Sequence, residues 1–306
     1  MKLDTKTKRI INLLEPLVKN NGMADTVLDD VKLIRSDRPF PRHPIVYEPF
    51  IMILAQGQKI VYLGSEIYKY DPDNYLVVTM PLPMECETIA GPEEPLLGIA
   101  IKVDPVMISE LLIKMDSTKP LSKSTPRGLY SSKLPELVKD AVIRLLESLA
   151  NPVDGRVLGP QIVREIVYRI LCDEHGEALR LLAVSHGRFG QMAKVLNRIH
   201  TDFNTKLNIE KLAEEANMSV SSFHSNFKTV TSTSPIQYIK EIRLQKARIF
   251  MVQDGLSASE AAVYVGYESA SQFSREFKRY FGNTPAYEAA RMREFFGAPL
   301  PADAIS

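Results

Sequence analysis

The sequence has no tryptophan and only two cysteines and five histidines among its 306 residues. Cys86 and Cys172 are too few for a disulfide framework, so we expect a protein of a reducing cytoplasm rather than a small secreted domain. Runs of 18 or more apolar residues are also missing, and the first residues lead into no signal-length apolar core. No membrane span and no secretory signal are therefore expected.

The sequence also has almost no net charge. Lys and Arg number 38 and Asp and Glu number 37, which leaves +1. Between residues 190 and 300, 14 Lys and Arg stand against 11 Asp and Glu, which leaves +3. This balance disfavours an architectural, sequence-indifferent DNA binder, which needs a strongly basic surface. It does not exclude a specific reader, because a few well-placed phosphate contacts are enough to position one.

A segment that recurs after 50 positions is the most informative pattern present. Residues 221–228 (SSFHSNFK) correspond to residues 271–278 (SQFSREFK), and the copies then reach Ser234-Pro235 and Thr284-Pro285. Two copies are too few for a solenoid. Each copy follows a short Ala-containing apolar stretch (212–218 and 261–267) that ends near Asn or Gly. Helix, tight turn and second helix predict two DNA-reading helix-turn-helix modules.

The periodicity of each second helix separates an inner from an outer face. With Ser219 as N-cap, the inner residues of the two helices are expected to be Phe223, Phe227 and Val230, and Phe273, Phe277 and Tyr280. The polar residues left outside are Ser221, Ser222, His224, Ser225 and Lys228 in one copy, and Ser271, Gln272, Ser274, Arg275 and Lys278 in the other.

Several of these outward side chains have the chemistry of base readers. Arg275 can bond guanine O6 and N7, and Gln272 can pair with adenine N6 and N7. Lys228, Lys278 and Arg279 lie further along and are predicted phosphate contacts. A helix beginning at Pro235 and running to about Gln253 would span about 28 Å, close to the ~34 Å between successive major grooves on one face of DNA.

The front half has a different texture. An amphipathic helix is predicted within residues 1–20, and short β-rich runs at 45–47, 51–54, 59–63, 75–78 and 96–103 alternate with Gly, Pro and Asn turns. This spacing predicts a β-sandwich or small barrel. Pro105 begins a helix, residues 119–132 read as a polar loop, and helices are expected at 134–150 and 160–172. Their apolar faces fit either packing against the β-domain or a two-helix dimer interface.

Residues 190–297 resemble the double helix-turn-helix domain of the AraC/XylS family of bacterial transcription regulators. The resemblance is carried by residues 262–269 (AVYVGYES), 273–278 (FSREFK) and 281–285 (FGNTP). It implies base-reading positions at Ser221, His224 and Ser225 in the first module, and at Ser271, Gln272, Ser274 and Arg275 in the second. The first module departs from many relatives in placing small serines where larger readers are common, which implies weaker base discrimination there.

The front half resembles the AraC-type regulator N-terminal domain through Arg38-Pro39, Tyr47-Glu48-Pro49, Gln56-Gly57 and residues 81–88 (PLPMECET). The resemblance implies a multidomain α+β chain with an N-terminal cupin-like β-barrel and a C-terminal all-α DNA domain. We expect a sensor domain at 1–115, a helical linker at 116–189 and a DNA-binding domain at 190–300. The implied partners are double-stranded DNA, a small-molecule effector and, for an activator, RNA polymerase, with a homodimer left open.

The front half offers a candidate effector site but no metal cluster. Its β-region contains a single histidine, His43, which cannot supply the ligand set of a cupin metalloenzyme, so no metal or cofactor is expected. The first hypothesis is therefore a ligand-responsive transcription regulator that binds DNA through both helix-turn-helix modules. A cupin-type enzyme with an accessory DNA domain is the second. A small barrel can still hold one ligand, and the candidate lining residues are Arg42, His43, Tyr47, Glu48, Tyr62, Tyr75 and Cys86. Acidic neighbours on both sides disfavour a reactive Cys86 thiol, and an inert or a sensing cysteine both stay open.

Overall fold

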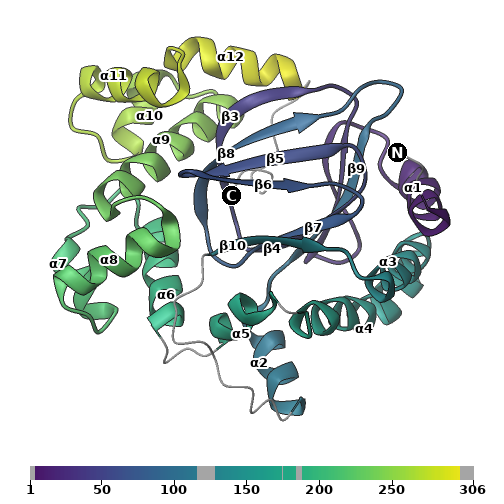
Figure 1. Ribbon diagram of the computed structural model, residues 1–306. Coiled ribbons are helices and arrows are strands. Elements are labelled where there is room, and N and C mark those ends of the chain that lie inside the picture. Colours follow the sequence, from purple (N-terminus) through teal and green to yellow (C-terminus); the bar gives the residue numbers. More distant parts are fainter. Residues whose placement is uncertain (1–3, 116–127, 174, 184–187, 297–306) are drawn as a thin grey trace.

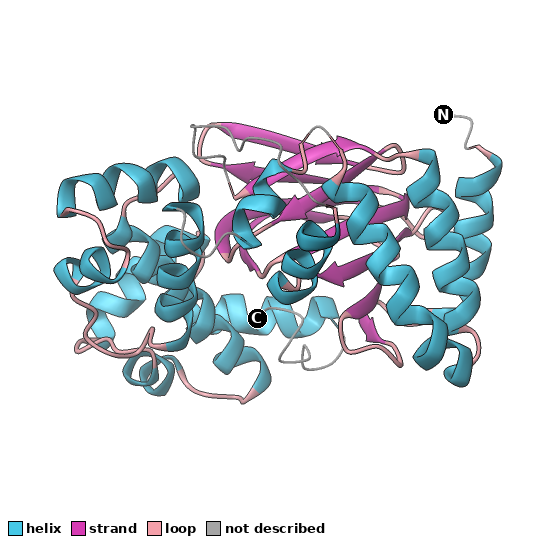
Figure 2. Ribbon diagram, turned by 90° about the horizontal axis from the view of Figure 1, so that it is seen from below, coloured by secondary structure: helices cyan, strands magenta, loops and turns pink. Residues whose placement is uncertain are grey.

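The computed structural model describes residues 4–115, 128–173, 175–183 and 188–296. A β-rich lobe with its own helices lies against an all-helical lobe (Figures 1 and 2). The strands are β1 (Gly22–Asp25), β2 (Val31–Ser36), β3 (Phe40–Tyr47), β4 (Phe50–Gln56), β5 (Gln58–Leu63), β6 (Glu66–Tyr70), β7 (Asn74–Val78), β8 (Leu82–Ile89), β9 (Leu96–Lys102) and β10 (Leu129–Lys133). The helices of the β-rich lobe are α1 (Thr5–Leu17), α2 (Pro105–Lys114), α3 (Glu136–Leu149), α4 (Pro152–Leu171) and α5 (Glu177–Ala183).

The strands form two antiparallel sheets that are not closed into a barrel. One sheet has the order β1-β2-β9-β4-β7-β10 and the other the order β3-β8-β5-β6. The five predicted runs are confirmed as β3, β4, β5, β7 and β9. The expected barrel is corrected to a two-sheet packing, because the pairing in each sheet ends at its edge strands. Closed and open forms share the same alternation of inward and outward residues, so the pattern alone cannot separate them.

The central strands of the larger sheet are apolar on both faces. In β4, β7 and β9 nearly every residue is buried, because α1 packs on β4 and β9 while the second sheet covers the other face. Strands buried on both sides read as continuous apolar runs rather than as alternation. The hydrophobic core is largest here. Packing in this core fixes the position of the second sheet, which contacts the helical lobe.

Helix α4 begins earlier than predicted. The pattern placed its start at Pro160, whereas the helix runs from Pro152, and the side chain of Asn151 caps it by accepting from the amide of Val153 (2.8 Å). Proline is well tolerated at the first position of a helix, and Pro160 inside costs one backbone bond. Packing between α3 and α4 offsets that loss. Most apolar residues of these two helices are buried, but Leu137 and Tyr168 are exposed.

The predicted loop at 119–132 is partly wrong. Residues 129–132 belong to β10, which pairs antiparallel with β7 in the register Leu129↔Val78 to Lys133↔Asn74. Residues 116–127 lie outside the described part of the chain. The strand was missed because Tyr130 alone among its residues has a strong β preference, and the tertiary pairing decides the conformation.

The helical lobe contains α6 (Arg188–Thr201), α7 (Ile209–Glu215), α8 (Val220–Thr231), α9 (Pro235–Gln253), α10 (Ala258–Tyr264), α11 (Ala270–Phe281) and α12 (Pro285–Phe296). Of all the helices within the described ranges, none combines the length and apolarity needed to cross a bilayer. Helix α9 lies along β3 and β8 of the smaller sheet, so the two lobes meet along this helix (Figure 1).

Candidate nucleic-acid interface

Two helix-turn-helix units stand at the ends of α9. Unit 1 consists of α7 and α8, and unit 2 of α10 and α11. Ser219 and Ser269 cap the second helices by accepting from the amides of Ser222 and Gln272 (3.3 Å each). The turns reverse through left-handed residues, Asn217 (φ 52°) and Gly266 (φ 84°). The predicted modules are therefore confirmed as helix, tight turn and helix.

The predicted inner faces carry the cores of the units. Phe223, Phe227 and Val230 are fully buried in unit 1, and so are Phe273 and Phe277 in unit 2. Tyr280 differs: it is half-buried, its hydroxyl accepts from Gln245 Nε2 (3.3 Å), and Phe281 fills the core position. The chain prefers this arrangement because a buried phenol needs a hydrogen-bond partner whereas phenylalanine does not.

The predicted base readers lie on the opposite, solvent-facing sides of α8 and α11. Ser221, Ser225, Ser271, Gln272 and Arg275 are exposed, and His224 and Ser274 are partly exposed. The predicted phosphate contacts Lys228, Lys278 and Arg279 are exposed as well. The Arg275 guanidinium makes no hydrogen bond or ion pair with any other described residue, so it is available to a ligand that binds this face.

Helix α9 ties the two units into one body. It runs from Pro235 to Gln253, as predicted, and Ser234 caps it. Arg243 donates from Nε to Phe203 O (2.7 Å), from Nη2 to Thr205 O (2.8 Å) and from Nη1 to Gly266 O (3.1 Å). One side chain thus joins the α6–α7 loop, which leads into unit 1, to the turn of unit 2. A Cβ on Gly266 would come within 2.6 Å of Asn204 O, so glycine is required there for packing as well as for its φ angle.

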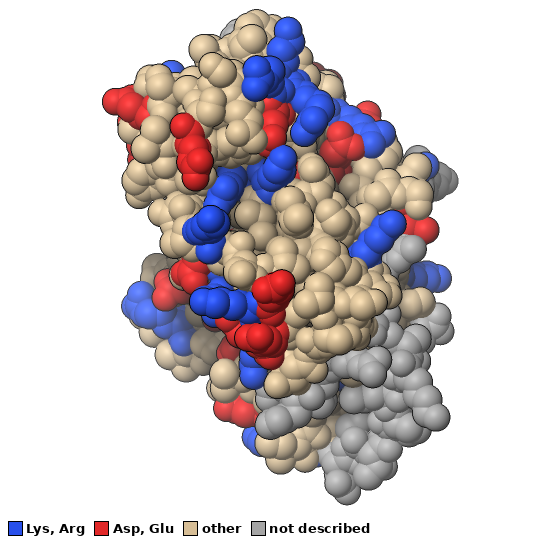
Figure 3. All heavy atoms as spheres, turned by 90° about the vertical axis from the view of Figure 1, so that its left-hand side faces the viewer, with Lys and Arg blue, Asp and Glu red and all other residues tan. Residues whose placement is uncertain are grey.

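The surface over these helices is mixed in charge. Figure 3 shows Lys and Arg side chains in a broken band across this side of the molecule, interspersed with Asp and Glu. There is no single basic patch on the face shown. Such a surface suits contacts to selected phosphates better than uniform wrapping of DNA.

The β-rich lobe contacts the helical lobe through buried polar groups. Arg248 of α9 is 1% exposed and donates from Nη2 to Pro44 O of β3 (3.0 Å) and to Gln245 Oε1 (2.8 Å). Its Nη1 lies 3.5 Å from Glu288 Oε1, and burial lowers the Arg248 pKa to about 10, which leaves it charged at neutral pH. Tyr238 Oη donates to Pro81 O (2.6 Å).

The β-rich lobe also reaches both units directly. Phe40 at the start of β3 belongs to the same apolar cluster as Phe281 and Met292, and Gly64 in the β5–β6 turn packs against Ser232 at the end of α8. A displacement of β3 would therefore be felt at α11, and a displacement of this turn at α8.

Glu241 makes this interface sensitive to pH. It lies on α9 and accepts from Gln237 Nε2 (2.9 Å). Burial, reinforced by the Glu85 carboxylate across the interface and opposed by Gln237, raises the Glu241 pKa to about 7. The folded protein therefore binds this proton more tightly than the unfolded chain does, and stability falls as the pH rises from about 4.5 to 7.

We expect Glu241→Gln to remove that loss. The variant should match the parent near pH 4.5 and exceed its free energy of unfolding by about 1–2 kcal/mol at pH 8. Urea unfolding at a series of pH values measures the difference, with Glu214→Gln, an exposed site in unit 1, as the control. A difference that stays constant with pH would contradict the assignment.

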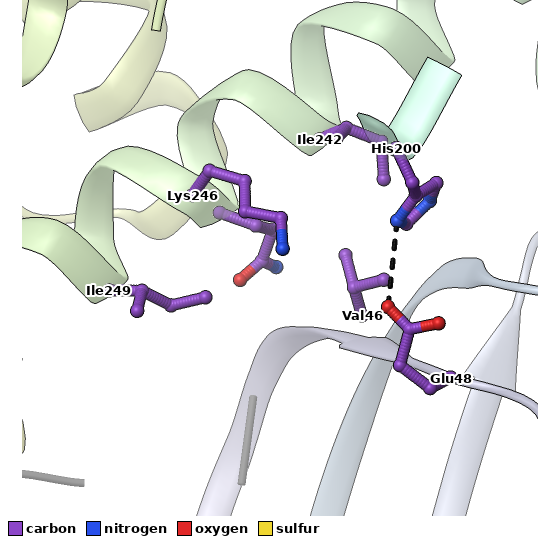
Figure 4. A pocket seen from close by; sticks show the side chains of 7 residues that line it. Val46, Glu48, His200, Ile242, Lys246 and Ile249 are labelled. Carbon is purple, nitrogen blue, oxygen red and sulfur yellow. Dashed lines mark ion pairs between the residues drawn. The ribbon is translucent and has the colours of Figure 1, made fainter. Parts of the chain in front are cut away.

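A small open pocket of about 10 Å³, room for about one water molecule, lies where the lobes meet, lined by Val46, Glu48, His200, Ile242, Gln245, Lys246 and Ile249. His200 Nδ1 faces Glu48 Oε1 at 3.7 Å (Figure 4). His200 Nε2 lies 2.9 Å from Tyr238 Oη. That hydroxyl donates elsewhere, so Nε2 carries the proton and Nδ1 is an acceptor. Burial and then Lys246 lower the His200 pKa to about 3, so the imidazole is neutral and this contact is not an ion pair at neutral pH. Burial also raises the pKa of Glu48.

The seven candidate effector residues do not converge on one cavity. Only Glu48 lines the pocket between the lobes. Tyr47 and Cys86 are buried between the sheets, where Tyr47 Oη donates to Cys86 Sγ (3.2 Å). Arg42 and Tyr62 stack on the outer side, with Arg42 Nε donating to Glu85 (2.8 Å).

The other two lie elsewhere. His43 packs edge-on against Phe40 at the contact between the lobes, and burial followed by the charge of Arg248 lowers its pKa to about 3. Tyr75 Oη donates to Asp173 Oδ2 (2.5 Å) at the β10 edge. These seven positions are five separate environments.

Comparison with known proteins identifies the family that has this architecture. Residues 27–178 match the family described as the AraC-type transcriptional regulator N-terminus, and residues 212–289 match a helix-turn-helix domain. The chain belongs to the AraC/XylS family of transcription regulators.

Relatives in the AraC/XylS family include the raffinose operon regulatory protein RafR of Pediococcus pentosaceus, 28% identical over 187 residues, which are 61% of this chain and 63% of RafR. The Msm operon regulatory protein of Streptococcus mutans is 30% identical over 88 residues, 29% of this chain and 32% of that protein. This chain thus spans less than two thirds of the length of either. VirF, a virulence regulon transcriptional activator of Yersinia enterocolitica, is 24% identical over 77% of this chain and 87% of its own.

Among solved structures, apo ToxT from Vibrio cholerae shares this fold of an AraC/XylS regulator. The TM-score is 0.57 at 9% identity, over 89% of this chain and 99% of that one. At this identity the likeness concerns the fold alone.

Sequence reasoning missed the residues that join the lobes. Arg248, Tyr238 and Glu241 lie on a helix recognised as a connector, and their partners are far away in the sequence. The available signal was a charge on an apolar helix face: Arg248 stands one turn from Leu244, Met251 and Val252, where a cation is costly unless it is paired.

Proposed function

We propose that this protein is a sequence-specific DNA-binding regulator of transcription, an activator, acting in the cytoplasm without catalytic activity of its own. The observation that carries the proposal is the pair of helix-turn-helix units held by α9, each exposing polar residues from the start of its second helix. In such units these positions enter the major groove. VirF, whose name describes a transcriptional activator, supports activation.

Each unit has its own part in reading. In α11, Arg275 and Gln272 read guanine and adenine, and Ser271 and Ser274 complete the contact. In α8, Ser221, His224 and Ser225 read less decisively because their side chains are short or make single bonds. Lys228, Lys278 and Arg279 bind phosphates and fix the register.

The β-rich lobe senses a small molecule and transmits its presence through β3 and β8. Support comes from the contacts that this lobe makes with α9 and with both units. A ligand that displaces either strand would change how the units are held. RNA polymerase is the partner of an activator. A second copy of the chain is a further partner, for which the exposed apolar residues Val153, Val157 and Leu158 of α4 offer a surface.

In vitro selection tests the proposal. Purified full-length protein is incubated with fragmented genomic DNA, and the retained fragments are sequenced. We expect the retained fragments to share one sequence motif and to contain promoters near it. Retention of all fragments alike, with a steep and uniform salt dependence, would contradict specific reading and indicate architectural binding.

A further inference from the structure

Glu276 holds the side chain of a predicted base reader. It lies on α11, one turn after Gln272, and Gln272 Nε2 donates to Glu276 Oε1 (3.2 Å). The same oxygen accepts from Lys240 Nζ of α9 (2.9 Å), and Oε2 accepts from Tyr267 Oη (2.9 Å). The Glu276 side chain is only 13% exposed, so it is anchored beneath the helix surface while Gln272 stands outside it.

The charge of Glu276 fixes which way the Gln272 amide points. Burial opposes ionisation, but the hydrogen bonds from Lys240, Gln272 and Tyr267 outweigh it and lower the pKa of Glu276 below its usual range. An ionised carboxylate only accepts hydrogen bonds. The Gln272 amide must therefore turn its nitrogen toward Glu276, which leaves its carbonyl oxygen and one N–H facing outward.

That remaining pair of groups discriminates between purines. Adenine presents an N7 acceptor and an N6 donor in the major groove, which match one N–H and one carbonyl. Guanine presents two acceptors, N7 and O6, so it would place O6 against the fixed carbonyl. A freely rotating amide suffers no such restriction.

We propose that Glu276 is a positioning residue that makes Gln272 select adenine at one base of the DNA site. The inference rests on the proposed function and adds to it the base that unit 2 prefers at that point. Unit 1 has a hydrogen bond at the corresponding positions, but there the later residue is the donor. Asn226, 50 positions before Glu276, donates from Nδ2 to Ser222 O (2.8 Å) and Oγ (3.2 Å). A hydrogen bond between this position of the helix and the residue one turn later is thus present in both units, but the carboxylate that orients an amide occurs in unit 2.

The test compares selected motifs of the full-length protein and its variants. Gln272→Ala first identifies the base that Gln272 reads. Glu276→Gln is then expected to lose, at that base alone, most of an about 5- to 150-fold preference for adenine, the range of one good bidentate contact. Glu276→Asp, which keeps the charge but shortens the reach, should act in the same direction and serves if the glutamine variant folds poorly.

Tyr267→Phe and Lys240→Met are the matched controls. Each removes one other bond to Glu276 and leaves Gln272 bonded, so we expect lower stability with an unchanged motif. An unchanged motif in the folded Glu276 variants, beside a changed one in Gln272→Ala, would overturn the inference and leave the proposed function standing. An equal loss of adenine preference in Tyr267→Phe would also overturn it, because the role would then be structural. If the parent selects no motif, the proposed function fails and the inference with it.

Discussion

Arg275→Ala is expected to weaken binding to the selected DNA site by about 5- to 150-fold and to relax a guanine preference at a single base. The loss corresponds to about 1–3 kcal/mol, the discrimination of one bidentate contact to O6 and N7. Arg275 is exposed in the first half of α11 and bonds to none of the described side chains, so its removal should leave the fold unchanged. Titration of matched and single-base-substituted duplexes measures both effects.

Lys278→Ala is the matched control because it removes a cation one turn further along the same helix. A phosphate contact carries no base information, so all sequences should weaken alike, and the slope of log affinity against log salt should fall by about one. The orientation of α11 would be wrong if Arg275→Ala left the preferred sequence unchanged or if the two variants behaved alike.

Arg248→Met should lower the free energy of unfolding by about 3 kcal/mol. Removing one partner of a buried ion pair strands the other charge, and here Glu288 is 0% exposed. Glu288 keeps bonds from Arg291 and Asn283, which limits the loss. The bond to Pro44 O and the stacking of Arg248 on Phe281 disappear as well. The variant should therefore weaken both the contact between the lobes and the packing inside the helical lobe.

Urea unfolding followed by circular dichroism measures this effect, since the chain has no tryptophan to report it. The double variant Arg248→Met with Glu288→Gln should recover part of the loss, because the buried carboxylate is then neutral, while Arg291, which loses it as a partner, is 30% exposed to solvent. Arg275→Ala serves as the exposed-arginine control and should unfold like the parent. Arg248 does not hold the lobes together if its replacement costs less than about 0.5 kcal/mol, the range of ordinary surface substitutions.

Local sequence signals determined the helical lobe well. A 3.6-residue period with Phe223 and Phe227 repeated 50 positions later as Phe273 and Phe277 leaves little freedom for those helices. The Ser-Pro and Thr-Pro pairs correctly begin α9 and α12, because proline fits the first helical turn. The same rule misled at Pro160, where packing against α3 carries the helix through a proline.

The candidate effector site was less predictable because neighbouring strand residues face opposite ways. Tyr47 points between the sheets whereas Glu48, the next residue, faces the helical lobe. Cys86 is buried between the sheets whereas Glu85 and Glu87 bond Arg42 and Tyr62 on the outer side. A list of nearby polar residues therefore mixes two faces, and only the register of β3 with β8 separates them.

The spacing within the selected DNA motif tests the central claim most directly, namely that one chain places two reading helices in successive major grooves. We predict two short blocks about one helical turn, roughly 10 base pairs, apart. Their separation should be fixed, because α9 and Arg243 hold the units rigidly. A single block, or two blocks whose separation varies among the selected sequences, would contradict the account.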